Sequence, residues 1–303
     1  MAQALQTLRV FMNPTRLDTS ALPAALAEAL NNVSEWDLPL PAQQLPSDVQ
    51  LIAQGGVHQV YRAALVTQQG TQSVAIRLPA DANPMGLPSR MGVTFDAEVA
   101  NQRLAASHLL APDIFWSEPH HQVIVMAYCE PNASVTIEDL SHCLRGIHQL
   151  SLVGERLDLT LSLERYGQIA SARGVSPNSL IDPYSLPLQE AIGVLAREPA
   201  VGCHHDLNAA NFLSGNGPVA IDWEYAAPGD PYFDIAAASA GNPHIEADAL
   251  IRAVLGEDYQ PTLWHIAKAV YQAVDVNWRA AMGKKVTQGE RENLMAYLSE
   301  ILE

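Results

Sequence analysis

Residues 201–234, VGCHHDLNAANFLSGNGPVAIDWEYAAPGDPYFD, decide the fold of this chain, because they set acidic and amide side chains between short apolar runs. The pattern predicts a strand that ends near Cys203, a polar loop, and two strands that pair antiparallel across a turn at residues 214–218. Asp206 and Asn211 then lie at the start of one strand, and Asp222 lies at the end of the next. Three oxygen-bearing side chains can therefore converge on one point, and a hard divalent cation such as Mg²⁺ prefers such ligands.

The order of these side chains resembles a known family. HHDLNAAN (204–211) followed by IDWE (221–224) is similar to the catalytic loop and metal-binding Asp of aminoglycoside phosphotransferases and of choline, ethanolamine and thiamine kinases. IDWEY (221–225) and GDPYFD (229–234) point to the choline and thiamine side of that superfamily. The resemblance implies that Asp206 is the catalytic base and that Asn211 and Asp222 hold Mg²⁺ on the phosphates of ATP. Ordinary loop capping by Asp and Asn is the plain alternative.

Two further residues of this stretch receive supporting roles from the resemblance. His204 is expected to brace the catalytic loop by hydrogen bonding, and Asp234 is expected to stabilise that loop from below. Simple capping of a helix N-terminus is the alternative for Asp234. The run His204-His205-Asp206 also admits a metal-dependent hydrolase, but the sequence has no second His-rich frame such as His-Glu-x-x-His.

Residues 49–78 are predicted to form strands and tight turns. Gly55 and Gly56 stand between β-favouring runs and resemble the nucleotide-covering loop of choline-type kinases, with a plain hairpin turn as the alternative. Arg77 occupies the place of the phosphate-pairing cation, and its guanidinium suits phosphate. Glu98, on a helix predicted over residues 94–108, is the expected partner of Arg77.

Strands over residues 114–116 and 123–126 complete the predicted sheet, and the chain then leaves it at an expected interlobe hinge. By the resemblance, the hinge at Met126 and Tyr128 receives the adenine. A helix over residues 19–33 precedes the sheet, and residues 81–92, rich in Pro, Gly and Met, are expected to form a mobile loop.

The second half of the chain has helical periodicity. Helices are predicted over residues 137–150, 161–172, 186–197, 260–282 and 288–302, and another is predicted to open at Asp230. Trp264, Tyr271 and Trp278 recur every seven residues, so they share a face. Core packing is one interpretation. The other is an aromatic wall for a quaternary ammonium or thiazolium ion, completed by Glu224, Tyr225 and Asp275.

The resemblance thus implies an α+β, two-lobed protein-kinase-like fold, with an antiparallel sheet and one main helix in the N-terminal lobe and a larger, mainly helical C-terminal lobe. The expected units are a helical extension over residues 1–45, a nucleotide-covering lobe over 46–127 and a catalytic, acceptor-binding lobe over 128–303.

Composition limits the possible partners. The 303 residues are 48% hydrophobic and 17% charged, with a net charge of −16, so nucleic acid and anionic membranes are disfavoured. The acidity suits a cationic substrate, although solubility alone explains it as well. Cys129, Cys143 and Cys203 show no Cys-x-x-Cys spacing, and we expect reduced thiols in a cytoplasmic protein. The N-terminal residues make a poor signal peptide, and no apolar run approaches membrane-spanning length.

The leading interpretation is an ATP- and Mg²⁺-dependent kinase that phosphorylates a hydroxyl of a small cationic alcohol: choline, ethanolamine or thiamine. An aminoglycoside or sugar phosphotransferase is the alternative within the class, and a catalytically silent nucleotide-binding relative is the alternative of another class. The acceptor, the choice between ATP and GTP, and the oligomeric state stay open at this point.

Overall fold

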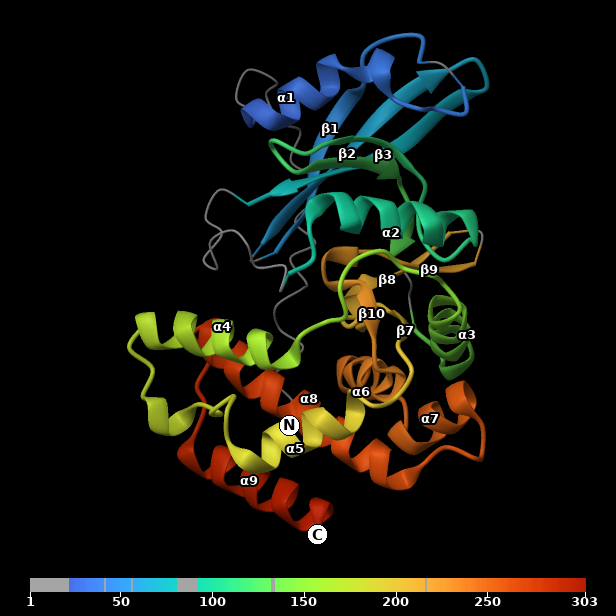
Figure 1. The fold of residues 1–303 in the computed structure, drawn as a ribbon. Helices are drawn as coiled ribbons and strands as arrows, with labels where there is room; N and C mark the ends of the chain where they lie inside the picture. The colour runs from blue at the N-terminus through green and yellow to red at the C-terminus, as the bar shows by residue number, and fades with distance from the viewer. Residues whose placement is uncertain (1–21, 41, 56, 81–91, 132–133, 216) are drawn as a thin grey trace.

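The structure is a computed structural model that describes residues 22–303 except 41, 56, 81–91, 132–133 and 216. It has an α+β architecture with two parts, a lobe built on an antiparallel sheet and a larger lobe built mainly of helices (Figure 1). The fold class predicted from the sequence is therefore confirmed. Gly56 and residues 81–91 of the expected mobile loop lie outside the described residues.

The N-terminal lobe is organised by a five-stranded sheet whose neighbouring strands all run antiparallel, in the order β1-β2-β3-β5-β4. The strands are β1 Ser47–Gln54, β2 His58–Thr67, β3 Gly70–Pro79, β4 Ile114–Glu118 and β5 Val123–Ala127. Every strand predicted for this lobe is present. β2 and β3 are joined by a two-residue turn, and Gly70 accepts the positive φ of 121° that this turn requires.

Helices cover both faces of this sheet because its strands alternate their side chains. Val74 and Ile76 of β3 pack with α1 (Ala24–Asn31), while Ala75 packs with α2 (Phe95–Ser107). Thr94 caps α2 by accepting a hydrogen bond from the backbone N–H of Ala97. The predicted first helix was too long: it begins after Pro23 and gives way to a short 3-10 helix at Val33–Glu35.

Seven helices of the described chain build the C-terminal lobe: α3 Ile137–His148, α4 Leu159–Ala172, α5 Leu186–Leu195, α6 Pro231–Gly241, α7 Ala247–Leu255, α8 Pro261–Ala281 and α9 Gln288–Leu302. α8 lies between the others and packs against α4, α5, α6 and α9. It begins at a proline in the N1 position, where the missing N–H costs nothing. α7 was not predicted; all the other helices were predicted to within a few residues.

Two small sheets hold the loop that carries Asp206 and Asn211. β8 (Phe212–Ser214) pairs with β9 (Pro218–Ala220) and with β6 (Glu130–Pro131), so the predicted hairpin is confirmed. β7 (Val201–Cys203) pairs with β10 (Ala227–Gly229). β10 was not predicted, because Pro and Gly are uncommon within strands. Short 3-10 helices follow at Ala209–Asn211 and Trp223–Tyr225, and another lies at Pro177–Ser179.

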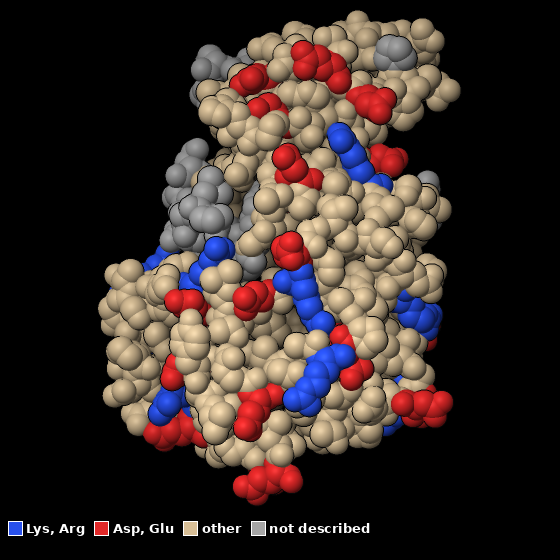
Figure 2. Space-filling view, viewed as in Figure 1, with Lys and Arg blue, Asp and Glu red and all other residues tan. Residues whose placement is uncertain are grey.

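The surface carries charges of both signs. On the face seen in Figure 2, acidic and basic side chains are scattered over the molecule rather than collected in one patch. None of the helices in the described part of the chain combines the length and apolarity of a membrane span.

Candidate active site

Asp206 lies in the loop between β7 and β8, and both oxygens of its carboxylate are fixed by amides. Asn208 Nδ2 donates to Oδ1 at 3.0 Å, and Asn211 Nδ2 donates to Oδ2 at 2.9 Å. Asn211 also donates to the backbone carbonyl of Asp206 at 2.9 Å. Burial and the neighbouring Asp222 raise the pKa of Asp206 to about 7, against the effect of the two amides. A carboxylate with such a pKa can accept a proton near neutral pH.

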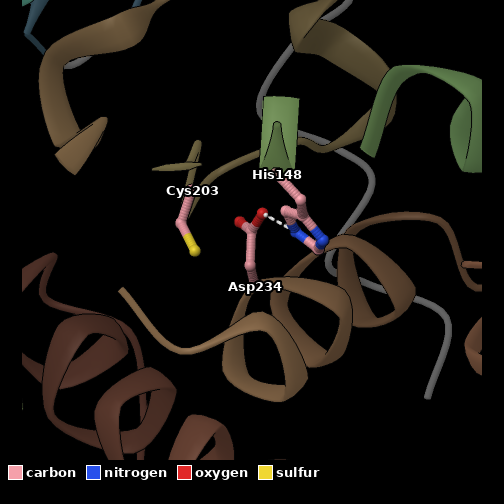
Figure 3. Close-up of side chains that lie close together, drawn as sticks. All are labelled: His148, Cys203 and Asp234. Atoms are coloured by element: carbon pink, nitrogen blue, oxygen red, sulfur yellow. Dashed lines mark hydrogen bonds and ion pairs between the residues drawn. The ribbon is translucent and has the colours of Figure 1, made fainter. Parts of the chain in front are cut away.

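Asp234, at the start of α6, supports this loop from below. Its carboxylate is fully buried, and Oδ1 accepts a 2.7 Å hydrogen bond from the backbone N–H of His205. Oδ2 accepts a 3.0 Å hydrogen bond from His148 Nε2 of α3, and Cys203 lies beside them (Figure 3). Burial raises the pKa of Asp234, but the hydrogen bond and charge of His148 outweigh it and hold that pKa below its ordinary value.

Although His148, Cys203 and Asp234 bring possible metal ligands together, the two carboxylate oxygens of Asp234 already accept hydrogen bonds from protein donors. We therefore interpret this cluster as a hydrogen-bonded support for the catalytic loop. The sequence analysis assigned His148 no role in the site. The chain separation of 86 residues between His148 and Asp234 leaves no local signal for their contact.

The two histidines of the loop are committed to backbone carbonyls. His204 Nε2 bonds the carbonyl of Ile221 at 3.1 Å, and the ring packs edge-on against Trp223. His205 Nδ1 bonds the carbonyl of Tyr225 at 2.9 Å. Burial lowers the pKa of His204 to about 4 and also lowers the pKa of His205, so both rings are neutral. Because the two rings point to different carbonyls, they do not form the ligand set of a metallohydrolase.

Arg77 of β3 reaches from the sheet lobe into the same region. Its guanidinium pairs with Glu98 of α2, and Nη1 donates to Asp222 Oδ1 at 2.9 Å. The predicted pair between Arg77 and Glu98 is thus present, and both side chains are buried. Burial lowers the pKa of Arg77, but the carboxylates of Glu98 and Asp222 outweigh this and raise it, so its charge is permanent.

The predicted metal ligands Asn211 and Asp222 offer hard oxygen donors. The Asn211 amide nitrogen is committed to Asp206, which leaves the amide oxygen as its ligand atom. Asp222 has a left-handed backbone with a φ of 66°, a conformation that few residues other than Gly adopt and that tends to occur at functional sites. The donor set of carboxylate and amide oxygens fits Mg²⁺.

His58 is a site residue that the sequence analysis missed. It opens β2; its Nδ1 lies 3.8 Å from Asp222 Oδ1 and its Nε2 lies 3.9 Å from Glu224 Oε2. Its position beside the two glycines was the only signal in the sequence that could have identified it. Gly55 donates its backbone N–H to the carbonyl of His58 at 2.8 Å.

The expected hinge residues Met126 and Tyr128 belong to the small apolar cluster under α2. Met126 is buried, and Tyr128 packs against the same cluster with Ala75 and Val60. The guanidinium of Arg62 lies 4.6 Å from the centre of the Tyr128 ring. An apolar surface therefore lies at the junction of β2, β3 and β5, where the sheet meets the rest of the chain.

Three tyrosines lie near Asp206. Tyr166 of α4 shares a side-chain hydrogen bond with Tyr225, and the charge of Asp206 acts on Tyr166, Tyr225 and Tyr271. Burial raises the pKa of all three phenols well above the ordinary value, so each keeps its proton and can donate. Glu224 is buried beside them. The sequence analysis did not identify Tyr166, because only the packing of α4 on α8 brings it to this point.

The three aromatic residues expected along α8 separate into different surroundings. Trp278 joins Tyr166 and Tyr225 in one small cluster, and the Lys284 ammonium lies 4.7 Å from the centre of its ring. Trp264 is 1% exposed in the main core, and its indole N–H donates to Asp248 of α7 at 2.8 Å. Of the two interpretations of the aromatic stripe, core packing holds for Trp264, because this side chain packs α8 against α7.

The comparisons with known proteins agree with this geometry. Residues 89–270 match APH, the phosphotransferase enzyme family. The chain belongs to this family. The protein is therefore a small-molecule kinase-like phosphotransferase. Among curated proteins, none matches the chain.

Solved structures share the fold of this phosphotransferase at low sequence identity. A choline/ethanolamine kinase family protein from Mesorhizobium loti is 19% identical with a TM-score of 0.60, covering 92% of this chain and 95% of that one. LicA in complex with AMP is 16% identical with a TM-score of 0.61, covering 91% and 98%. The spectinomycin phosphotransferase APH(9)-Ia is 15% identical with a TM-score of 0.52, covering 91% and 94%.

Proposed function

We propose that this phosphotransferase is an ATP- and Mg²⁺-dependent kinase that phosphorylates a hydroxyl of a small cationic alcohol, with choline, ethanolamine or thiamine as acceptors. The observation that carries the proposal is the fixed carboxylate of Asp206, held by Asn211 and set opposite Asp222. Phosphoryl transfer needs positioning and charge neutralisation more than covalent chemistry, and this arrangement supplies both.

The catalytic role proposed for Asp206 is that of a general base. Its carboxylate takes the proton of the acceptor hydroxyl as the acceptor oxygen forms a bond to the γ-phosphorus of ATP. The bond from that phosphorus to the β–γ bridging oxygen breaks, and its electron pair leaves with ADP. The amides of Asn208 and Asn211 keep the carboxylate from rotating away from the acceptor.

Arg77 and the proposed metal ligands act on the phosphates. Asn211 and Asp222 would hold Mg²⁺, which supplies charge neutralisation at the β- and γ-phosphates when it is bound. Arg77 adds a permanent positive charge, and Glu98 fixes its guanidinium. We assign the covering of the nucleotide to Gly55 and Gly56, and the adenine contact to the backbone and apolar surface at Met126 and Tyr128.

The proposed acceptor site combines negative charge with aromatic rings. Glu224, Tyr225 and Tyr271 lie close to Asp206, and Trp278 packs with Tyr225. Carboxylates and aromatic faces both favour a cation. Asp275 is less available than the sequence indicated, because Arg279 Nε donates to it at 2.7 Å. Choline and ethanolamine kinases among the solved structures with a similar fold support this acceptor class.

A panel of acceptors with coupled detection of ADP tests the function. We expect turnover with at least one of choline, ethanolamine and thiamine, and its loss in Asp206→Ala. Turnover with aminoglycosides or sugars alone would replace the proposed acceptor class with the alternative, for which the spectinomycin phosphotransferase is a structural precedent. Binding of Mg-ATP without transfer to any acceptor would indicate a catalytically silent relative.

We also propose that the protein acts in the cytoplasm on small molecules and not on nucleic acid. The three cysteines, Cys129, Cys143 and Cys203, form no disulfide, and the net charge of −16 repels polyanions. Burial raises the pKa of the Cys143 thiol to about 12, so that thiol is unreactive.

A further inference from the structure

Helix α6 is hydrogen-bonded to the catalytic loop on both sides of Asp206. At its start, Asp234 accepts the backbone N–H of His205, the residue before Asp206. At its end, Asn242, the residue that caps α6, donates to the backbone carbonyl of Leu207 at 3.0 Å. Leu207 is the residue after Asp206. The proposed base therefore lies between two residues whose backbones are both held by the same helix.

The side-chain amide of Asn242 is fully buried, and both of its N–H groups donate to backbone carbonyls. Nδ2 donates to Ala238, one turn back in α6, at 2.7 Å and to Leu207 of the catalytic loop. Only the first of these contacts belongs to the helix. Asn often ends a helix because it tolerates a left-handed backbone, but the φ of Asn242 is −129°. The contact with the buried Leu207 is therefore the better explanation for an amide at this position.

Gly241, the last residue of α6, allows the helix to approach the loop closely. A Cβ at this position would lie 2.6 Å from Asn208 Cβ and 2.8 Å from Asn208 Cα. The second distance involves the backbone, so an alanine at position 241 would have to displace Asn208. Gly241 has a helical backbone without a positive φ, and glycine is otherwise less favourable than alanine in a helix. The close contact with Asn208 is therefore what favours glycine here.

Asn208 connects the contact with Gly241 to the proposed base. Its Nδ2 donates to Asp206 Oδ1 at 3.0 Å, and its Oδ1 accepts from the backbone N–H of Ala210 at 2.9 Å. The place of Asn208 against α6 thus sets a hydrogen bond that orients Asp206. Asn211, the proposed metal ligand, is held elsewhere: its backbone carbonyl accepts from the N–H of Ile221, directly after β9, at 3.0 Å. The end of α6 therefore acts on the base more than on the metal ligand.

We propose that Gly241 and Asn242 are positioning residues that hold Asp206 in the orientation required for phosphoryl transfer, an inference that rests on the proposed function. They act through Asn208 and Leu207. The groups proposed to bind the nucleotide, the metal and the acceptor lie on other elements. Loss of the contacts at the end of α6 should therefore lower kcat and leave the KM values near those of the parent. A misplacement of about 1 Å can lower the rate of a reaction about 100-fold.

Asn242→Ala and Gly241→Ala test the inference in the full chain, with the acceptor that the panel identifies. Each variant should lower kcat at least about tenfold, while the KM values for ATP and for the acceptor change by less than about twofold.

Asn277→Ala is the matched control for Asn242→Ala. Asn277 is also fully buried, and its Nδ2 donates to the backbone carbonyls of Leu163 and Ile181, neither of which belongs to the catalytic loop. The control should lower the melting temperature about as much as Asn242→Ala does, because both variants remove donors from carbonyls in the protein interior. Its kcat should stay within about threefold of the parent value.

Hydrogen exchange, measured by mass spectrometry, provides a second readout that needs no turnover. Peptides that cover residues 204–211 should exchange faster in Asn242→Ala and in Gly241→Ala than in the parent, and at the parent's rate in Asn277→Ala. Gly241→Ala keeps both donors of Asn242, so it still tests the inference if Asn242→Ala does not fold.

The inference is overturned if the variants at the end of α6 lower the melting temperature but leave kcat and the exchange of residues 204–211 unchanged. It is also overturned if a KM rises in place of the fall in kcat, or if Asn277→Ala lowers kcat as much as Asn242→Ala. Failure of every acceptor with the parent chain would contradict the proposed function instead, and the exchange rates alone would then show whether the end of α6 holds the loop.

Discussion

Arg77 Nη1 donates a 2.9 Å hydrogen bond to Asp222 Oδ1, and this contact joins a strand of the N-terminal lobe to a proposed metal ligand 145 residues later in the chain. The same guanidinium pairs with Glu98, which is fully buried in α2. A permanent positive charge therefore stands between the sheet, the covering helix and the loop after β9. The side chain that we propose to bind phosphate is therefore also part of the packing between the lobes.

Removing the Arg77 charge should destabilise the protein through the acid that is left behind. We expect Arg77→Met to lower the free energy of unfolding by about 3–5 kcal/mol, because Glu98 then stays buried without its partner. The double variant Arg77→Met/Glu98→Met should recover most of that stability, since both buried charges are gone. Neither the single nor the double variant should transfer a phosphoryl group. Urea denaturation and the ADP assay measure the two effects, and equal stabilities for the single and double variants would contradict the explanation.

Replacing the proposed base should remove turnover and leave the fold intact. Asp206→Asn keeps the size of the side chain and should lower kcat by about 10²–10⁴-fold, the usual contribution of a general base. We expect little change in melting temperature, because removal of a charge that burial and Asp222 disfavour offsets the loss of one of the two amide hydrogen bonds. Nucleotide binding, measured by fluorescence or calorimetry, serves as the control. Full transfer by this variant would show that another group accepts the proton.

The burial of Asp230, which is 4% exposed, should be visible in the pH dependence of stability. Burial raises the pKa of Asp230 from 3.8 to about 6. The folded state then holds its proton more tightly than the unfolded state, so ionisation costs stability as pH rises between these values. The difference corresponds to about 3 kcal/mol. Asp230→Asn lacks this cost.

Urea denaturation of both proteins at pH 4 and pH 7 measures this effect. The stability of Asp230→Asn relative to the parent should rise over that interval, by up to about 3 kcal/mol, and stay constant at higher pH. Contributions of other groups cancel in the difference between the two proteins. A relative stability that falls over the same interval would mean that the folded state favours the ionised form of Asp230, and would contradict the explanation by burial.

Much of this architecture could be predicted because its signals are local. The hairpin of β8 and β9 follows from a turn between two apolar runs, and α3 follows from apolar residues three or four positions apart. The interactions that were missed join residues distant in the chain. His148 meets Asp234, and Tyr166 meets Tyr225, only after helices have packed, and periodicity carries no information about such pairs.

The aromatic residues of α8 separate into different surroundings for another physical reason. Residues seven positions apart drift by about 20° around a straight helix, so Trp264 and Trp278 differ by about 40° in direction. α8 is also surrounded by helices on several sides, so a shared stripe does not meet a single environment. Trp264 faces α7, whereas Trp278 lies near the tyrosines.

The tyrosine pair should affect the binding of the acceptor and not the binding of the nucleotide. Tyr166→Phe keeps the ring but removes a phenol that shares a hydrogen bond with Tyr225 near Asp206. We expect the KM for the acceptor to rise about fivefold, as for the loss of a hydrogen bond of about 1 kcal/mol, while the KM for ATP stays unchanged. By contrast, Trp264→Phe should lower stability without changing the acceptor KM. A raised acceptor KM in Trp264→Phe, with no change in Tyr166→Phe, would indicate that Trp264 contacts the acceptor.

Gly229 should be required where β10 passes the catalytic loop. A Cβ at this position would lie 2.3 Å from His205 Nε2 and 3.1 Å from Cys203 Sγ. Gly229→Ala must therefore push the His205 ring away and strain its bond to the Tyr225 carbonyl. We expect a loss of about 1–3 kcal/mol in the free energy of unfolding, the usual cost of overpacking, together with a fall in kcat because His205 precedes Asp206.

Two variants separate this steric explanation for Gly229 from a general intolerance of alanine. Gly193→Ala in α5 adds a Cβ with no heavy atom within 4 Å, so it should be neutral or stabilising by about 0.5–1 kcal/mol. His205→Ala removes the ring that an alanine at position 229 would strike. If the clash is the cause, Gly229→Ala should cost far less stability in the His205→Ala background than in the parent chain. Equal costs in the two backgrounds would mean that the backbone of β10, and not the His205 ring, selects glycine at this position.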